Sequence, residues 1–420
     1  MAIVIAGAAC TSAAPSSDRS AATAAPGTSV VAHPVDDEVT PLIVTTVGGD
    51  PIPVKGSDDK FHVAYELSVL NYHPYPAVIT SLDTVARDGK VVTSLSGEQV
   101  RANTIIVPNL STLTGAPASG IPPGGTGLLV LEDVYPDRAS IPPSVTHRIA
   151  ASFNPPDDAS DPTGLFPSSV TQTAGPMTIS TKDPVVLGAP VAGPGWATSN
   201  GCCDGIKGFH RAALLPIGGA INGTERFGID FGRVTADISP GTTLSHDMVV
   251  KPGTDGTKNE DYLGYGAPLL AVADATVVQV VADVADTPIG GRNSTEGLTL
   301  HGAGGNTVVL QLAPDLFAYY LHNAPGSTTV KAGDKVIKGQ QIAQLGSSGN
   351  SAAPHLHFQL GRSPQAYSAE NVPYVFDSFV LKGTVTDAGD TFVAEPPPGP
   401  RQAELPLRNN VVDFPSSQQS

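Results

Sequence analysis

Glycine and proline interrupt the sequence so often that long helices are not expected. The chain of 420 residues contains 45 glycines and 39 prolines, and its apolar runs are short. Several of these runs alternate between apolar and polar residues, as half-buried strands do. A hydrophobic content of 40% is enough to bury ordinary cores, and the length favours two to three domains. We therefore expect an all-β protein with more than one domain.

The excess of acidic residues argues against negatively charged binding partners. The formal net charge is -16, with 23 basic and 39 acidic residues. Nucleic-acid binding needs clustered lysine and arginine to contact phosphates, and the sequence has no such clusters. We expect no nucleic-acid partner, and no acidic substrate held by charge alone.

The first residues, MAIVIAGAACTSAAPSSDRS, contain a short apolar run that ends at small residues and Cys10. This resembles the end of a bacterial lipoprotein signal peptide, with Cys10 as the lipidated residue. The absence of a preceding basic segment is explained if the start is assigned too late. The alternative is an ordinary disordered N-terminus. Membrane contact is expected only through Cys10, because no other segment is long and apolar enough to span a bilayer.

Composition divides the rest of the chain into regions. Residues 1–36 read as a signal-like segment and disordered tether, and residues 37–185 as a β-sandwich of immunoglobulin-like type. Its strand candidates are FHVAYELSVLNY, AVITSLDTVA, GKVVTSLSG, TGLLVLEDVY and VTHRIAASF. A second antiparallel β-domain is expected over residues 186–363. Residues 364–420 read as a C-terminal strand and a proline-rich tail.

Cys202 and Cys203 are adjacent. This is not a zinc-finger spacing, because neighbours on a strand point to opposite faces and no second cysteine pair follows. Consecutive Cα atoms lie about 3.8 Å apart, below the usual range for a disulfide, so a bridge between them would be strained. We interpret the pair as structural or as a local redox clamp, and not as a nucleophile.

The stretch SAAPHLHFQL places His355 and His357 on the same face of a predicted strand, because side chains alternate along a strand. Two imidazoles on one face can hold one metal ion, or one can bind metal while the other moves protons. Upstream, His322 follows the apolar run AYYL, and Asp230 lies within RFGIDFG.

This ordered set resembles the LytM and lysostaphin type of zinc endopeptidases, which cut peptide cross-links of bacterial peptidoglycan. The matching segments, in family order, are RFGID, YLH, GSSGNSAAP and HLH. The resemblance implies an antiparallel β-domain of the duplicated hybrid motif, with Asp230 and His357 as zinc ligands. It also implies that His322 and His355 activate the attacking water and stabilise the developing oxyanion.

Arg226 departs from the family pattern, because it stands where the family has its first zinc-binding histidine. A catalytic zinc ion normally has three protein ligands, and a guanidinium offers no lone pair. Three outcomes are open. His210 could supply the missing imidazole, with His246 and His301 less attractive because they lie in predicted loops. Arg226 could turn away and leave two ligands, or it could pair with Asp230 in place of the metal.

We therefore expect an exported, zinc-dependent endopeptidase acting on peptidoglycan cross-links or another Gly-rich peptide through a water activated by the metal. The protein is expected in the bacterial cell envelope, lipid-anchored or secreted. The alternative is a catalytically inactive relative that binds cell wall or regulates a wall hydrolase. Arg226 motivates this alternative, and it places the expected zinc in doubt.

Overall fold

The computed structural model describes residues 39–107, 120–154, 165–291 and 299–416. Val39–Ser420 form one compact unit, and the other unit, Met1–Glu38, lies outside the described residues together with Cys10. The α-helices of the described ranges are only α1 (Gly97–Ala102) and α2 (Leu300–Ala303). None of the helices in these ranges is long and apolar enough to cross a membrane.

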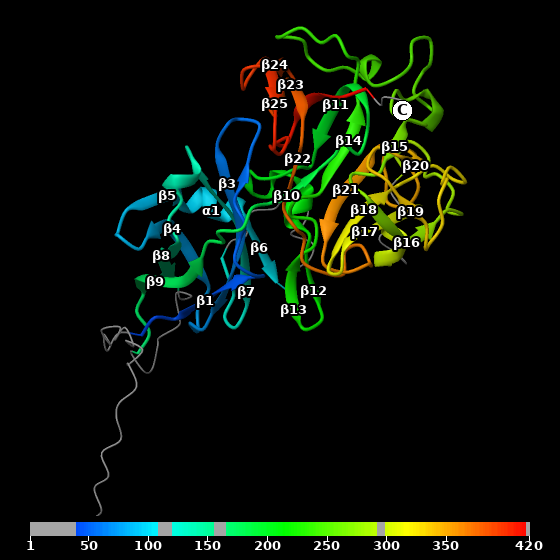
Figure 1. The fold of residues 1–420 in the computed structure, drawn as a ribbon. Coiled ribbons are helices and arrows are strands. Elements are labelled where there is room, and N and C mark those ends of the chain that lie inside the picture. Colours follow the sequence, from blue (N-terminus) through cyan, green and yellow to red (C-terminus); the bar gives the residue numbers. More distant parts are fainter. Residues whose placement is uncertain (1–38, 108–119, 155–164, 292–298, 417–420) are drawn as a thin grey trace, which may run out of the picture. The chain divides into compact units, whose positions relative to one another are not determined.

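Two antiparallel sheets form the N-terminal part (Figure 1). The first contains β1 (Leu42–Val47), β2 (Val54–Lys55), β3 (Phe61–Asn71), β7 (Thr126–Tyr135) and β6 (Thr104–Val107). The second contains β5 (Val91–Ser96), β4 (Ala77–Ala86), β8 (Ser144–Phe153) and β9 (Ser169–Thr178). Side chains of both sheets share one core. The five predicted strands are confirmed, because they correspond to β3, β4, β5, β7 and β8. The immunoglobulin-like type of this arrangement stays a prediction.

Strand β3 is buried on both faces. Val63, Tyr65 and Leu67 point into the core that the two N-terminal sheets share. The side chains between them, Ala64 and Glu66, are buried on the opposite face, because successive residues of a strand alternate. Ala64 belongs to the same core as the strands of the C-terminal part. The second face of β3 therefore packs against the region that carries the predicted site.

An eleven-stranded sheet dominates the C-terminal part. Its strands, in spatial order, are β19 (Lys335–Val336), β16 (Ala275–Val281), β17 (Thr307–Ala313), β18 (Leu316–Leu321), β21 (Leu356–Gly361), β14 (Ile229–Arg233), β11 (Gly193–Ser199), β26 (Asn410–Phe414), β23 (Phe379–Val385) and β24 (Phe392–Val393), with β25 (Gly399–Arg401) paired to β23. Figure 1 shows β14, β21, β18 and β17 side by side. All pairings within this sheet are antiparallel.

Three two-stranded sheets complete the described strands. They are β10 (Val185–Leu187) with β22 (Tyr374–Phe376), β12 (Leu214–Ile217) with β13 (Ala220–Gly223), and β15 (Pro268–Leu270) with β20 (Gln341–Gln344). The β10–β22 pair is parallel. Strand β26 lies between β11 and β23 inside the large sheet, and Val412 and Phe414 are buried in its core. The proline-rich composition of the C-terminal region gives no hint of this central strand.

A buried polar cluster lies inside the N-terminal core. The hydroxyl of Tyr65 donates to Asp133 Oδ2 over 3.0 Å, and it lies 3.0 Å from His147 Nε2. Burial raises the pKa of Asp133 to about 6, although hydroxyl groups nearby partly oppose the shift. A carboxyl with a raised pKa binds its proton more tightly in the folded state than in the unfolded chain. The stabilisation it provides is complete below about pH 4 and is lost as pH rises through about 6.

The variant Asp133→Asn replaces this carboxylate with a neutral side chain of the same shape. We expect the variant to gain up to about 3 kcal/mol in unfolding free energy at pH 8, because two pKa units correspond to that energy. At pH 3.5, below the pKa of the unfolded chain, the gain should largely vanish. Urea unfolding at both pH values measures the difference, with the exposed Asp50→Asn as control. Equal gains at both pH values would contradict this account of Asp133.

Candidate metal centre

Neighbouring strands bring four of the predicted residues to one place. Asp230 on β14 lies directly opposite His357 on β21 in the antiparallel register. Strand β18 flanks β21 on its other side, with Leu321 opposite His357, and His322 follows Leu321. His355 immediately precedes β21. The sheet therefore gathers these residues although they are far apart in the sequence.

His210 reaches the same place from a loop. It lies in the 3-10 helix Phe209–Ala212, and its side chain is buried. Its Nδ1 lies 3.0 Å from the carbonyl oxygen of Gly228, two residues before Asp230. A Cβ at Gly228 would stand 3.1 Å from that Nδ1, so glycine leaves the space that the imidazole occupies. The bond to Gly228 directs Nε2 of His210 toward Asp230.

His210, Asp230 and His357 form a group that could hold a metal ion. Their ligand atoms all lie within 4.8 Å of one another. Nε2 of His210 lies 3.3 Å from Asp230 Oδ2, and Nδ1 of His357 lies 3.0 Å from Asp230 Oδ1. Two imidazoles and one carboxylate make a donor set that suits zinc.

Hydrogen bonds fix which nitrogen of each ring is free. The amide of Gln359 donates to the carbonyl oxygen of Thr224, so its Oε1 faces Nε2 of His357 at 3.0 Å. An amide oxygen only accepts, so Nε2 of His357 must carry the proton. In His210, Nδ1 carries the proton because it faces a carbonyl oxygen. When each ring is neutral, Nδ1 of His357 and Nε2 of His210 are therefore the nitrogens that face Asp230 with a lone pair.

The carboxylate of Asp230 fits a bound cation. Its Oδ2 accepts a hydrogen bond of 2.8 Å from the amide of Asn200. Its buried Oδ1 has no hydrogen-bond donor among the described residues, although it lies beside the free Nδ1 of His357. Lone pairs that face one another without a proton between them repel, and a cation relieves this repulsion. The residues present thus fit a metal ion.

The electrostatics of the group also favour positive charge. Burial would raise the pKa of Asp230, but His210 and His355 outweigh it and hold that pKa well below its usual value. Burial would lower the pKa of His210, but the charge of Asp230 raises it to about 9. A proton and a metal ion therefore compete for His210, and metal binding displaces the proton.

His322 and His355 stand beside this group without belonging to it. Nδ1 of His322 lies 2.8 Å from the carbonyl oxygen of Ser348, and Nδ1 of His355 lies 2.8 Å from that of Ala353. Each ring therefore leaves Nε2 free. The rings are 4.7 Å apart, and Nε2 of His355 lies 3.5 Å from Asp230 Oδ1. The His355 side chain is 19% exposed, the most open of the four histidines.

Arg226 does not face the group. Its guanidinium forms ion pairs with Glu66 on β3 and with Glu370, and no ion pair joins it to Asp230 in the described structure. Burial works to lower the pKa of Arg226, but the two carboxylates outweigh it and raise that pKa. The pairing of Arg226 with Asp230, one of the three outcomes left open by the sequence, is therefore not what the structure contains.

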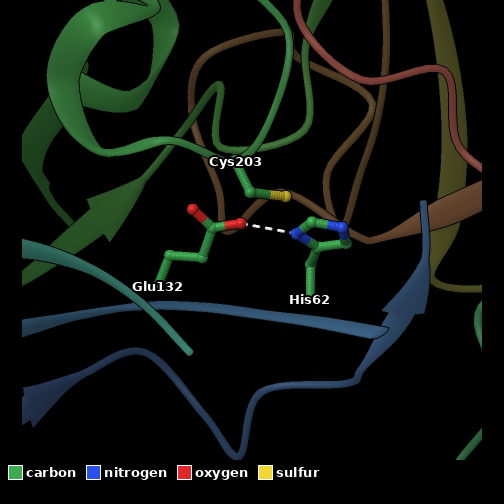
Figure 2. A group of neighbouring side chains, drawn as sticks. All are labelled: His62, Glu132 and Cys203. Atoms are coloured by element: carbon green, nitrogen blue, oxygen red, sulfur yellow. Dashed lines mark hydrogen bonds and ion pairs between the residues drawn. The ribbon is translucent and has the colours of Figure 1, made fainter. Parts of the chain in front are cut away.

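A second cluster contains His62, Glu132 and Cys203, and Figure 2 shows their side chains together. The sulfur of Cys203 is bonded to Cys202 in a disulfide, so it offers no thiolate to a metal. Burial lowers the pKa of His62, but Asp58 and Glu132 outweigh it and raise that pKa to about 9. The protonated ring and its carboxylates satisfy one another, so this cluster is an ion-pair group. The structural or redox role of the cysteine pair stays a prediction.

Two residues of the site were not predicted. Gln359 orients His357, and its position two residues along the same strand face is a signal that could have revealed it. Asn200 bonds to Asp230 through its amide and accepts a bond from the backbone N–H of Phe209. Asn200 thus links the carboxylate to the helix that carries His210. The sequence offers no motif that marks Asn200.

Residues 261–369 match the family model described as Peptidase family M23. This segment belongs to peptidase family M23. It contains His322, His355 and His357, whereas His210 and Asp230 precede it. A stretch of 76 residues is 40% identical to the peptidoglycan DD-endopeptidase ShyA of Vibrio cholerae serotype O1, covering 17% of each protein. The chain thus spans about a sixth of the length of that curated relative.

Solved structures of peptidases are also similar to the chain. The catalytic domain of lysostaphin from Staphylococcus simulans is 24% identical, with 37% of this chain and 80% of that chain covered and a TM-score of 0.20. A zinc containing peptidase from Vibrio cholerae is 13% identical, with 74% and 80% covered and a TM-score of 0.21. The M23 family is zinc-dependent, and His210, Asp230 and His357 form a candidate metal group in this chain.

The variant His210→Ala tests the candidate metal centre. We expect zinc content after dialysis to fall from about one ion per chain to near none, because only two ligands would remain. Elemental analysis measures it, and His246→Ala, which changes an exposed histidine, should retain zinc. Retention of zinc by His210→Ala would exclude His210 as a ligand.

Proposed function

We propose that this chain is a zinc-dependent endopeptidase that cleaves peptide cross-links of peptidoglycan or another Gly-rich peptide. The observation that carries the proposal is the unpartnered Oδ1 of Asp230 beside the free nitrogen of His357, in a chain with an M23 segment. A buried carboxylate oxygen without a donor is costly unless a cation compensates it. The similarity to ShyA, a peptidoglycan DD-endopeptidase, supports peptidoglycan as the substrate.

The residues divide into two roles. His210, Asp230 and His357 would hold the zinc and leave one position for a reactant. When bound, zinc supplies a Lewis acid that polarises the scissile carbonyl and makes water more acidic. The free Nε2 of His355 can accept the proton of the attacking water and return it to the leaving amine.

His322 acts beside His355. Burial, together with the neighbouring His355 and His357, holds the pKa of His322 well below its usual value, so its ring stays neutral. Its Nδ1–H is donated to Ser348, and its Nε2 can accept a hydrogen bond from water. We assign to His322 the orientation of the water that His355 deprotonates.

The alternative is a catalytically inactive protein that binds cell wall or regulates a wall hydrolase. The reason for this alternative is that Arg226 stands at the position of a metal ligand in the family pattern. This reason is weakened by the ion pairs of Arg226 with Glu66 and Glu370, because the guanidinium faces these carboxylates and not Asp230. We place the proposed activity in the bacterial cell envelope, with the chain secreted or lipid-anchored through Cys10.

The variant His355→Ala separates catalysis from metal binding. We expect the zinc content to be unchanged and the cleavage of cross-linked muropeptides to fall by about 10²- to 10⁴-fold, as on loss of a general base. Chromatography of digested muropeptides measures the rate, with His246→Ala as an active control. Undiminished cleavage by His355→Ala would refute the proposed role. Tight wall binding without cleavage by the intact, zinc-loaded protein would favour the alternative.

A further inference from the structure

Glu66 is a fully buried carboxylate on β3 that lies between two guanidinium groups. Its Oε1 accepts from Nη2 of Arg211 over 3.3 Å, and both of its oxygens accept from Nε of Arg226 over 2.9 and 3.1 Å. The exposed fraction of the Glu66 side chain is 0%. A buried charge is tolerated only when it is paired and hydrogen-bonded, so Glu66 and the two arginines depend on one another.

The first guanidinium belongs to the helix that carries His210. Arg211 follows His210 in the 3-10 helix Phe209–Ala212, and its side chain is fully buried. Besides Glu66, its nitrogens donate to the carbonyl oxygens of Leu131 on β7 over 2.9 Å and Cys203 over 2.7 Å. Ala212 packs in the same cluster as Leu128 and Val130 of β7. The N-terminal sheet thus anchors this helix.

The second guanidinium belongs to the segment that holds the ring of His210. Arg226 lies two residues before Gly228, whose carbonyl oxygen accepts from Nδ1 of His210. Nη1 of Arg226 pairs with the carboxylate of Glu370. That carboxylate also accepts a hydrogen bond from the backbone N–H of Gly223 over 3.3 Å. The carboxylate of Glu66 therefore joins the two segments that determine the position and the tautomer of His210.

We propose that Glu66, contributed by the N-terminal sheet, is a positioning residue for the metal centre. It acts through Arg211 and Arg226, and it touches neither the metal ligands nor the reacting atoms. The inference rests on the proposed zinc site. Residues that orient metal ligands typically change metal affinity by about 10- to 100-fold when mutated. Arg226 stands where the family has its first metal ligand, and in this chain it helps to hold His210, the proposed replacement ligand, in position.

The variant Glu66→Gln tests this proposal. It removes the charge, retains the shape and leaves all three metal ligands in place. We expect zinc affinity, measured by competition with a chelator, to weaken about 10- to 100-fold. The cobalt-substituted variant should also show altered d–d absorption, because a displaced His210 changes the coordination. Neither measurement depends on peptidase activity.

The matched control is His62→Gln. His62 lies on the same face of β3, and its ion pairs are with Asp58 and Glu132. Glu132 also acts electrostatically on Arg211, and this carboxylate stays in place in the His62→Gln variant. We expect this variant to lose stability and to retain the zinc affinity and the cobalt spectrum of the intact protein. Equal weakening in both variants would overturn the assignment, because general loosening of the packing would explain it.

A second variant decides the question if Glu66→Gln does not fold. Arg226→Lys keeps a positive charge but cannot bond to Glu66 and Glu370 in the same forked geometry. We expect weaker zinc binding than in the intact protein. Unchanged zinc binding in either folded variant would overturn the role of Glu66. Absence of zinc from the intact protein would instead refute the metal centre itself.

Discussion

The burial of Glu66 is the constraint on which the arrangement of the C-terminal part depends. A carboxylate with no exposed surface must be matched by cations, and Arg211 and Arg226 supply them. Both arginines belong to segments next to the candidate metal centre. The N-terminal sheet is therefore part of the structure around that centre, and β3 contributes to two cores at once.

Asp230 is a second buried carboxylate, and its charge is compensated by other partners than that of Glu66. Within the described ranges no ion pair joins Asp230 to a guanidinium, and its ionisable neighbours are His210, His355 and His357. Hydrogen bonds to Gly228 and Gln359 leave one nitrogen of His210 and one of His357 free to face it. Arginine satisfies a carboxylate permanently, whereas an imidazole can exchange its proton for a metal ion. This difference distinguishes the ion-paired Glu66 from Asp230 in the candidate metal site.

Much of the candidate site was predictable from local patterns. The alternation of β21 places His357 on one face, and the ordered segments around His322 and Asp230 identify their common region. The role of Arg226 was not predictable, because its partner Glu66 lies 160 residues away on another sheet. The position of His210 also depended on tertiary contacts, which bring its ring to Gly228 and Asp230, whereas His246 is exposed. The side chain of His301 lies outside the described residues. No local rule identifies such a pairing.

The fold was predictable to a similar extent. Strands β4 and β7 begin and end as their sequences indicate. Strand β26 was missed, because the prolines around it dominate the composition while the short run NVVDF is buried between two partners. Composition reports the average of a segment, whereas burial of a few residues decides its place.

The central claim is that His210 replaces the ligand that Arg226 cannot provide. Anomalous diffraction at the zinc edge from zinc-loaded crystals tests this claim most directly. We predict one strong peak about 2.0 to 2.2 Å from Nε2 of His210, Nδ1 of His357 and an oxygen of Asp230. Absence of a peak at Asp230, or a peak there without His210 as a ligand, would contradict the account.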